Sequence, residues 1–411
     1  MTRTRRVRRR VAATFAIPTG RDARIVAIAS VVDALGNGLY LPIAALFFVN
    51  AVGLPVEQVG LGLSITGVVA LAGHVAGGPP IDRFGPRNVT LVLNVLRAAA
   101  YAAFPLVRGF WAFVLLASFT HLLDNVGRVA MQSLVAGLVD PGERVTTAAF
   151  VRSIRNIGYG VGGLLVSAAL ALGGRGPYVG LVLGNAVSFL VAAALLRRVS
   201  DTRAPRPEGP RTGYGVVLAD RRFVALAATH GVLSLHLSVL LFAFPLWIDQ
   251  RTNAPAALAG AIFTLNSALV VLLQVPFSRR SHDVASGGRA LRRSGIALLA
   301  ACVLLALSEG LPVYAAAGVL LVTGVVECVA ELEEASGGWA VSLGLAPDEA
   351  RGRYLGVWAL GFSVHEIGGP AVMGFLIARG GGPGIVAFGA VVAAAGVLAS
   401  RLARAGAADP P

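Results

Sequence analysis

The sequence predicts an all-α membrane protein with twelve transmembrane helices in two related six-helix bundles. Of its 411 residues, 56% are hydrophobic and only 14% are charged, and the mean hydropathy is +0.74. In a soluble domain about a quarter of the residues are charged. Apolar runs of about 18 residues or more recur along the whole chain, and each is long enough to cross a bilayer as a helix. A polar linker rich in proline, glycine and arginine separates six runs from six.

The apolar runs give the expected position of each helix. In chain order the twelve helices are expected at 25–49, 59–80, 88–107, 111–138, 145–172, 177–197, 222–247, 256–277, 290–308, 312–345, 353–378 and 384–402. Several exceed the roughly 20 residues that a crossing needs, and tilt or extension beyond the bilayer accommodates the excess. The tenth run is the longest, and it either bends at Gly337–Gly338 or extends out of the bilayer.

The arginines indicate the orientation of these helices. The chain has a formal net charge of +14 and contains no lysine. With the N-terminus inside, 27 of its 35 arginines fall on the cytoplasmic side and 4 in the outer loops. Cytoplasmic loops of membrane proteins carry such an excess, so both termini are expected to be cytoplasmic. The basic charge therefore reflects topology and not nucleic-acid binding, in a multi-pass protein of the bacterial inner membrane.

The polar linker also defines the domains. We expect a basic cytoplasmic tail at 1–24, an N-terminal bundle at 25–199, a cytoplasmic linker at 200–221, a C-terminal bundle at 222–404 and a tail at 405–411. The halves resemble each other, because RIVAIASVVD from Arg24 matches RFVALAATHG from Arg222, and DPGER from Asp140 matches APDEARGR from Ala346. Internal repeats of this kind are typical of secondary transporters, whose substrate site lies near mid-membrane between the halves.

The turn between the second and third runs carries a specific motif. Its sequence is GGPPIDRFGPR, and five of its residues fit the pattern G-x-x-x-D-R-x-G-x-R: Gly78, Asp82, Arg83, Gly85 and Arg87. This pattern resembles the signature loop of the major facilitator superfamily. The resemblance covers the whole chain, since the fourth helix contains an arginine and the fifth contains the glycine-rich stretch RNIGYGVGG.

The resemblance implies a conformational latch. In that family the loop aspartate pairs with groups at the cytoplasmic start of helix 11 and holds the inside closed, which implies Arg351 and Arg353 as partners of Asp82. The corresponding stretch of the second half, SRRSHDVASGGRALRRS, lacks the pattern, so the latch is expected to be one-sided. Antiporters of the family often carry a Gly-Pro pair in helix 5, whereas this chain has glycine pairs there without proline.

Acidic residues inside the apolar runs are the candidates for proton coupling. A charged side chain at the membrane centre costs at least ~2.5–3.5 kcal/mol, so it must face a partner or a watery cavity. Three acids of the tenth helix share one face by their i, i+4, i+7 spacing, and Asp33 lies in the first helix. The candidates are Glu331, with Asp33 as the alternative, and the neighbouring Glu327 and Glu334. Glu333 points away from this face and is expected to be peripheral.

The other polar residues of the helices are expected to line a substrate cavity. They are Asn37, Tyr40, His121, Asp124, Asn125, Arg128, Arg152, Arg155, Asn156, His236 and Glu366. Arg128 lies thirteen residues before Pro141 and Glu334 thirteen before Pro347, so the repeat places these two at matching depths. The N-terminal half has four arginines within its helices, and the C-terminal half has acids and no arginine. The alternative is that such pairs only tie the halves together.

The resemblance implies a transporter and not an enzyme. Its partners are a small-molecule substrate, protons and the lipid bilayer, and a monomer is expected, with no nucleic acid, cofactor or metal. Export of a drug-like molecule or metabolite by proton antiport is one interpretation, and uptake or facilitated transport of a nutrient is the alternative. HEIGG from His365 begins like the zinc-protease motif H-E-x-x-H, but its fifth residue is Gly369. We find no nucleotide-binding P-loop.

Overall fold

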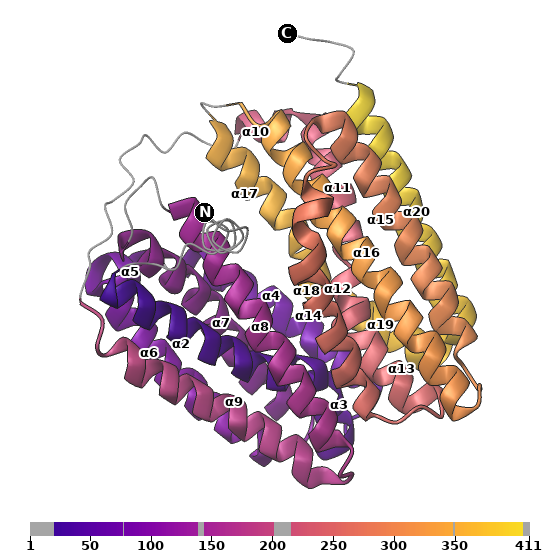
Figure 1. Ribbon diagram of the computed structural model, residues 1–411, viewed down its shortest axis with the longest axis horizontal. Coiled ribbons are helices and arrows are strands. Elements are labelled where there is room, and N and C mark those ends of the chain that lie inside the picture. Colours follow the sequence, from indigo (N-terminus) through magenta and orange to yellow (C-terminus); the bar gives the residue numbers. More distant parts are fainter. Residues whose placement is uncertain (1–19, 77, 139–143, 201–214, 348–349, 406–411) are drawn as a thin grey trace, which may run out of the picture.

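The computed structural model describes residues 20–76, 78–138, 144–200, 215–347 and 350–405 (Figure 1). Within these ranges every regular element is helical, and nine helices are long and apolar enough to cross a membrane. Two further apolar helices, Val56–Leu71 and Ile154–Leu170, are shorter, and one of the nine, Arg353–Arg404, covers both of the last two expected runs. The expectation of an all-helical membrane protein is therefore confirmed.

The helices form two bundles that follow the halves of the chain (Figure 1). The N-terminal bundle contains α2 (Arg21–Tyr40), α3 (Ala44–Leu46), α4 (Val56–Ala76), α5 (Gly78–Phe84), α6 (Pro86–Ala103), α7 (Phe110–Leu138), α8 (Arg144–Leu170) and α9 (Arg175–Leu196). The C-terminal bundle contains α10 (Gly215–Ala219), α11 (Arg221–Leu233), α12 (His236–Ser238), α13 (Phe244–Arg251), α14 (Ala257–Ser278), α15 (Val284–Leu307), α16 (Val313–Leu345), α17 (Arg351–Phe362), α18 (Val364–Ile367), α19 (Gly369–Phe375) and α20 (Gly381–Ala405).

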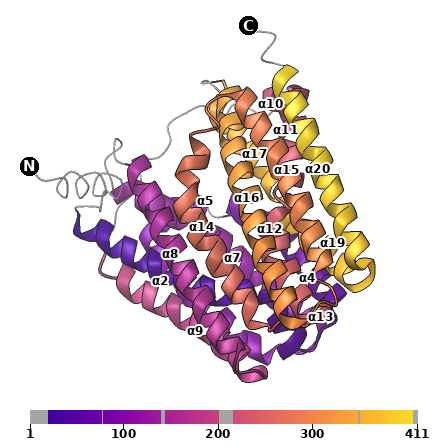
Figure 2. The same ribbon diagram turned by 45° about the vertical axis from the view of Figure 1, so that its right-hand side comes forward.

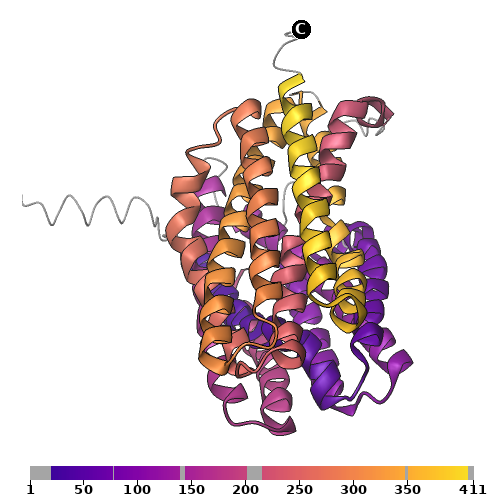
Figure 3. The ribbon, with the colours of Figure 1, turned by 90° about the vertical axis from the view of Figure 1, so that its right-hand side faces the viewer.

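The two bundles converge at one end and diverge at the other. In Figure 1 they meet near α3 and α13, and they separate toward the end that carries α10 and α17. Across this junction α8 packs on α14, as Figure 2 also shows, and α4 packs on α18 and α19. Figure 3 shows the C-terminal bundle from its outer side. At the converging end Asn50 Nδ2 donates a hydrogen bond to Asp249 Oδ1 over 3.0 Å, which joins the bundles directly.

Three of the expected helices are interrupted where a single run was predicted. The first leaves α-helical geometry after Tyr40, because Pro42 lacks an N–H, and it ends in a π-helical segment at Phe47–Ala51. The seventh turns between α11 and α12, and the eleventh is broken between α17 and α19. The tenth, by contrast, is one continuous helix through Gly337–Gly338. Gly337 serves close packing instead, since a Cβ there would lie 2.7 Å from the carbonyl oxygen of Gly287.

The motif between α4 and α6 is a short helix and not only a tight turn. The helix α5 ends at Phe84. The next residue, Gly85, has a φ of 80°, in the left-handed region that glycine adopts freely. Arg87 then donates Nε to Leu196 O and Nη2 to Arg197 O, over 3.2 and 2.6 Å, so it caps the last turn of α9. Arg83 is exposed over the ring of Phe84.

The proposed latch falls largely on residues whose side chains the structure does not describe. The side chains of Asp82, Arg351 and the flanking Pro79, and the surroundings of Gly78, lie outside the described set. In Figure 1, α5 lies on the N-terminal bundle and α17 on the C-terminal bundle, well apart. The latch therefore stays a prediction.

Glycines bring the bundles into backbone contact at the converging end. A Cβ on Gly260 would lie 2.5 Å from the carbonyl oxygen of Gly163, and one on Gly163 would lie 3.0 Å from that of Gly260. On α4, a Cβ on Gly67 would lie 2.3 Å from the carbonyl oxygen of Glu366. Small residues allow such close approach of membrane helices.

Replacing Gly260 by valine is expected to push the bundles apart at this end. The side chain has no room, and overpacking of this kind costs about 1–3 kcal/mol. The measurement is the alkylation rate of a cysteine introduced at Ser64, whose Oγ accepts a hydrogen bond from Ala371 N across the junction. The rate should rise in Gly260→Val and stay unchanged in Gly180→Val, where a Cβ meets nothing within 4 Å. Equal rates in the two variants would contradict this packing.

Candidate functional site

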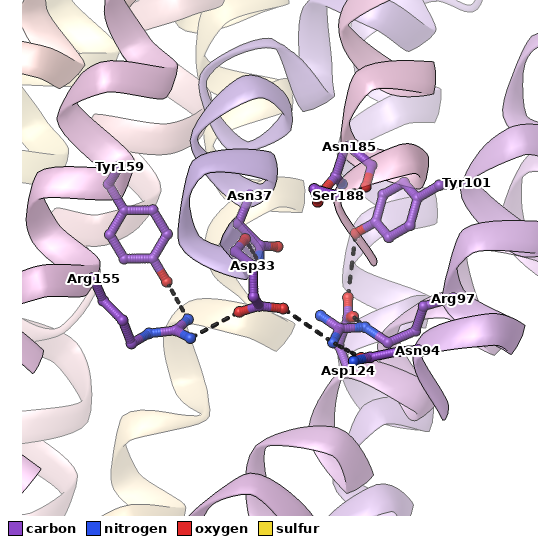
Figure 4. Close-up of polar contacts among 10 residues, drawn as sticks. All are labelled: Asp33, Asn37, Asn94, Arg97, Tyr101, Asp124, Arg155, Tyr159, Asn185 and Ser188. Atoms are coloured by element: carbon purple, nitrogen blue, oxygen red, sulfur yellow. Dashed lines mark hydrogen bonds and ion pairs between the residues drawn. The ribbon is translucent and has the colours of Figure 1, made fainter. Parts of the chain in front are cut away.

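A chain of buried charges crosses the N-terminal bundle (Figure 4). Asp33 of α2 lies between two arginines: its Oδ1 accepts from Arg97 Nη1 over 3.3 Å and its Oδ2 from Arg155 Nη1 over 2.7 Å. Arg97 Nε also donates to Asp124 Oδ1 on α7 over 2.5 Å. Two acids and two arginines from four helices thus balance one another. Asp33 is 7% exposed and Arg97 8%, so these charges depend on each other and not on water.

Aromatic side chains hold this chain of charges in place. The hydroxyl of Tyr101 donates to Asp124 Oδ2 over 3.3 Å, and Arg155 Nη2 donates to the hydroxyl of Tyr159 over 2.7 Å. The guanidinium carbon of Arg97 lies 3.9 Å from the ring centre of Phe189, within the range of a cation–π contact. With donors and acceptors matched, the cluster avoids the penalty of an unpaired buried charge.

A second cluster, of acids and histidines, occupies the C-terminal bundle. His236 Nδ1 lies 3.1 Å from Glu327 Oε1, and His230 Nε2 lies 2.5 Å from Glu334 Oε1. Asn266 of α14 donates Nδ2 to Glu331 Oε2 over 2.8 Å. The three acids lie on α16 at i, i+4 and i+7, and the turn between α11 and α12 directs both histidines toward that face.

A cavity of 470 Å³ adjoins the second cluster. Its polar lining consists of Arg128, His230, His236, Glu331, Glu334, Ser342, Ser363 and Glu366, with Trp339 and Trp358 among the apolar residues. Arg128 is the lining residue that comes from the N-terminal bundle, and its Nη2 lies 3.4 Å from Glu366 Oε1 on α18. The cavity therefore lies at the junction of the bundles: residues of the C-terminal bundle line most of it, and Arg128 borders it from the N-terminal bundle.

The structure distributes the expected cavity residues among several places. Arg128, His236 and Glu366 line the cavity, together with the proton-coupling candidates Glu331 and Glu334. Asp124 and Arg155 belong to the N-terminal charge chain. The other expected residues lie outside both sites. Tyr40 belongs to an aromatic cluster, with its ring centre 4.9 Å from that of Tyr101. The side-chain amides of Asn37 and Asn125 donate to the carbonyl oxygens of Asp33 and Ala70, and His121 and Asn156 are half-buried. The side chain of Arg152 lies outside the described set.

One ion pair corrects the expected charge distribution of the C-terminal half. The helix α15 begins at Val284 and not at 290, because Asp283 and Ser286 form a capping box there. The Ser286 N–H holds the pKa of the Asp283 carboxyl below its usual range. Arg293 therefore lies well inside α15 and not in the cytoplasmic loop, and its Nε and Nη2 bind Glu333 over 2.8 and 2.7 Å. Glu333 does point away from the cavity, but it is buried.

The two clusters also contain residues that the sequence did not lead us to expect there. Arg97, Tyr101, Asn266 and His230 were not among the expected site residues, although each lies in an apolar run. The cost of burying a charge or an amide was the available signal for Arg97 and Asn266. Tyr101 and His230 gave no distinct signal, since such residues often occur in helix cores.

Comparison with known proteins places the chain in a family. The family model of the Major Facilitator Superfamily matches residues 26–332. The chain belongs to this superfamily. Among curated relatives it is similar to the multidrug resistance protein MdtH of Yersinia enterocolitica, with 28% identity over 60% of this chain and 61% of that protein. It is also similar to MdtH of Enterobacter sp. strain 638, with 26% identity over 84% of each chain. The first match therefore spans less than two thirds of its relative.

Solved structures of other transporters share the fold. The crystal structure of the nucleoside transporter NupG matches 95% of this chain and 100% of its own, with a TM-score of 0.72 and 14% identity. A POT family transporter in complex with 5-aminolevulinic acid matches 92% of this chain and 95% of its own, with a TM-score of 0.72 and 11% identity. At such identities the likeness concerns the fold alone. The family match indicates a membrane transporter and not an enzyme.

Replacing Arg128 by alanine is expected to reduce transport while leaving stability nearly unchanged. Its side chain is 56% exposed, and ion pairs in such surroundings contribute about 0–1 kcal/mol. The variant removes the guanidinium group from the cavity lining, so transport and not stability should change. Arg128→Lys should restore transport only in part, because lysine lacks the planar fork of arginine. Transport and thermal unfolding should be measured together, with Arg108→Ala, an exposed residue between α6 and α7, as the control. Wild-type transport by Arg128→Ala would exclude this role.

Proposed function

We propose that the chain exports a small drug-like molecule or metabolite by alternating access, in exchange for protons. The observation that carries this proposal is the placement of Glu331, a carboxylate at the cavity between the bundles whose described hydrogen bond comes from the neutral Asn266. A carboxylate held by an amide gains or loses a proton without breaking an ion pair. Asp33, by contrast, is bound to two arginines. Glu331 is therefore our first candidate for the coupled proton, and Asp33 the alternative.

The names of the relatives and the proposed topology support export as the direction of transport. The MdtH proteins are named for multidrug resistance, which supports export. We propose twelve membrane crossings with both termini cytoplasmic, in a monomer of the bacterial inner membrane, because the arginine bias agrees with that orientation. The diverging end of Figure 1, which carries α10 and α17, is then the cytoplasmic end, so the bundles are arranged for loading from inside.

The available energy is sufficient for this exchange. A proton moving down ~100 mV releases ~2.3 kcal/mol, and one pH unit adds ~1.36 kcal/mol. The sum of ~3.7 kcal/mol per proton sustains roughly a 500-fold substrate gradient. Coupling requires a group whose pKa changes with access or with substrate, and Glu331 and Glu334 both line the cavity.

The test is transport by the purified protein in liposomes. Ethidium is loaded with the protein in vesicles, and a pH gradient is then imposed in either direction. Exchange predicts that ethidium moves in the direction opposite to the downhill flow of protons. A protonophore should abolish this movement. Movement of dye together with protons would identify uptake instead, and movement that ignores the gradient would identify a facilitator.

A further inference from the structure

We propose that His236, Glu327 and Glu331 form a binding site for one divalent transition-metal cation, of the Zn²⁺ or Mn²⁺ class. This goes beyond the proposed export, because it assigns a second ionic ligand to the acidic cluster of the C-terminal bundle. His236 and Glu327 are 91 residues apart in the chain, so no local spacing of metal ligands marks the site in the sequence. The fold brings them together by packing α12 against α16.

The geometry of the three side chains suits a shared cation. One ligand atom from each of them lies within 4.8 Å of the other two. His236 Nδ1 and Glu327 Oε1 are 3.1 Å apart. Two ligands on one Zn²⁺ at their usual distances lie roughly 2.9–3.4 Å apart, for octahedral and tetrahedral angles respectively. A cation therefore fits between this nitrogen and this oxygen without rearrangement. The Glu331 oxygen, within 4.8 Å of both, supplies the third ligand after a side-chain shift toward the cation.

Outer groups orient all three ligands. The second ring nitrogen of His236, Nε2, faces Glu334 Oε2 at 3.8 Å. Asn266 Nδ2 donates to both carboxylates, over 3.3 Å to Glu327 Oε2 and 2.8 Å to Glu331 Oε2. In metal sites a ligating histidine commonly directs its other nitrogen to a carboxylate, and ligating carboxylates are themselves hydrogen-bonded. The second feature is present here, and for the first the Glu334 carboxylate lies on the Nε2 side of His236, at a distance longer than a hydrogen bond.

Burial and access also agree with a cation site. His236 is 1% exposed and Glu327 0%, whereas Glu331 is half-buried and lines the cavity. A cation entering through the cavity meets Glu331 first and the buried pair next. Carboxylates inside a membrane protein require a counter-charge, and a divalent cation offsets two of them. One imidazole among carboxylates favours Zn²⁺ or Mn²⁺ over Mg²⁺ and Ca²⁺, which prefer all-oxygen ligands.

The test is metal binding by the purified full-length protein, stripped with a chelator and kept in detergent. Titration calorimetry with Zn²⁺, and electron paramagnetic resonance with Mn²⁺, should show one saturable site per chain. Mg²⁺ should bind at least tenfold more weakly than Zn²⁺. His236→Asn and Glu331→Gln should each weaken Zn²⁺ binding by about 10- to 100-fold, on the scale of altered metal sites. Zn²⁺ should raise the Tm of the wild type but not that of Glu331→Gln.

The matched control is His282→Asn. His282 is an exposed histidine beside Asp283, 3.4 Å away, and it is the obvious place for accidental surface binding. This variant should bind Zn²⁺ as the wild type does. Absence of saturable binding by the wild type, equal affinity for Mg²⁺, or loss of binding in His282→Asn alone would each overturn the proposal. Because the readout is binding and not transport, such a result leaves gradient-driven export standing, and a failure of export leaves the metal site standing.

Discussion

Replacing Asp33 by asparagine is expected to lower the free energy of unfolding by about 3–5 kcal/mol, the usual cost of removing one partner from a buried ion pair. The substitution leaves Arg97 and Arg155 with one carboxylate, Asp124, between them. The measurement is reversible unfolding in detergent and denaturant. Glu57→Gln is the control, because its pair with Arg379 is half-exposed and 3.6 Å long. It should change the stability by less than about 1 kcal/mol.

A double variant separates charge balance from packing in this prediction. Removing Arg155 as well, in Asp33→Asn with Arg155→Met, restores equal numbers of acids and arginines. If unpaired charge is the cause, much of the lost stability should return, as a double-mutant cycle would show. A double variant that is less stable than Asp33→Asn by the full cost of Arg155→Met alone would mean that the two residues act independently, against the contacts in Figure 4.

Replacing Glu331 by glutamine is expected to abolish accumulation driven by a pH gradient, while downhill exchange of substrate continues. The amide keeps the size and hydrogen bonding of the carboxyl but cannot carry a proton across. The ~3.7 kcal/mol available per proton is then no longer coupled, and the accumulation ratio should fall to that of a passive carrier. The measurement is transport in liposomes with and without the imposed gradient.

Two variants serve as comparisons for Glu331→Gln. Glu309→Gln removes an acid of the same bundle that pairs with Arg251 outside the cavity, and it should respond fully to the gradient. Asp33→Asn tests the alternative site, provided that enough folded protein remains. A full response by Glu331→Gln together with a lost response by Asp33→Asn would move the proton site to α2. If neither variant matters, the coupling hypothesis fails.

Helix faces were predictable from the sequence because they depend on local spacing alone. The i, i+4, i+7 pattern predicted that Glu327, Glu331 and Glu334 share one side of α16, and they do. The same geometry predicted that Glu333 points elsewhere. Hydropathy predicted the membrane class for a similar reason, since crossing a bilayer sets a minimum length of apolar helix.

Contacts between helices were not predictable in this way. The repeat placed Arg128 at the depth of Glu334, but its ion pair is with Glu366 of α18, which packs on α4 at the junction. Arg293 was counted among the cytoplasmic arginines although the helix expected at 290–308 includes it, and the capping box at Asp283 places it well inside α15. Periodicity identifies the residues on a face, but which helix meets that face depends on packing over the whole chain.

The glycine contacts between the bundles bear on how fast the protein can work. Where side chains interdigitate, they must change rotamer before two surfaces separate, and each change adds to the barrier. Gly163 and Gly260 meet backbone to backbone and have no rotamers to change. Contacts of this type, with a Cα–H against a carbonyl oxygen, are worth about 0.5–1 kcal/mol each. Under the proposed mechanism, this end of the protein would be closely packed and still separate quickly in every turnover.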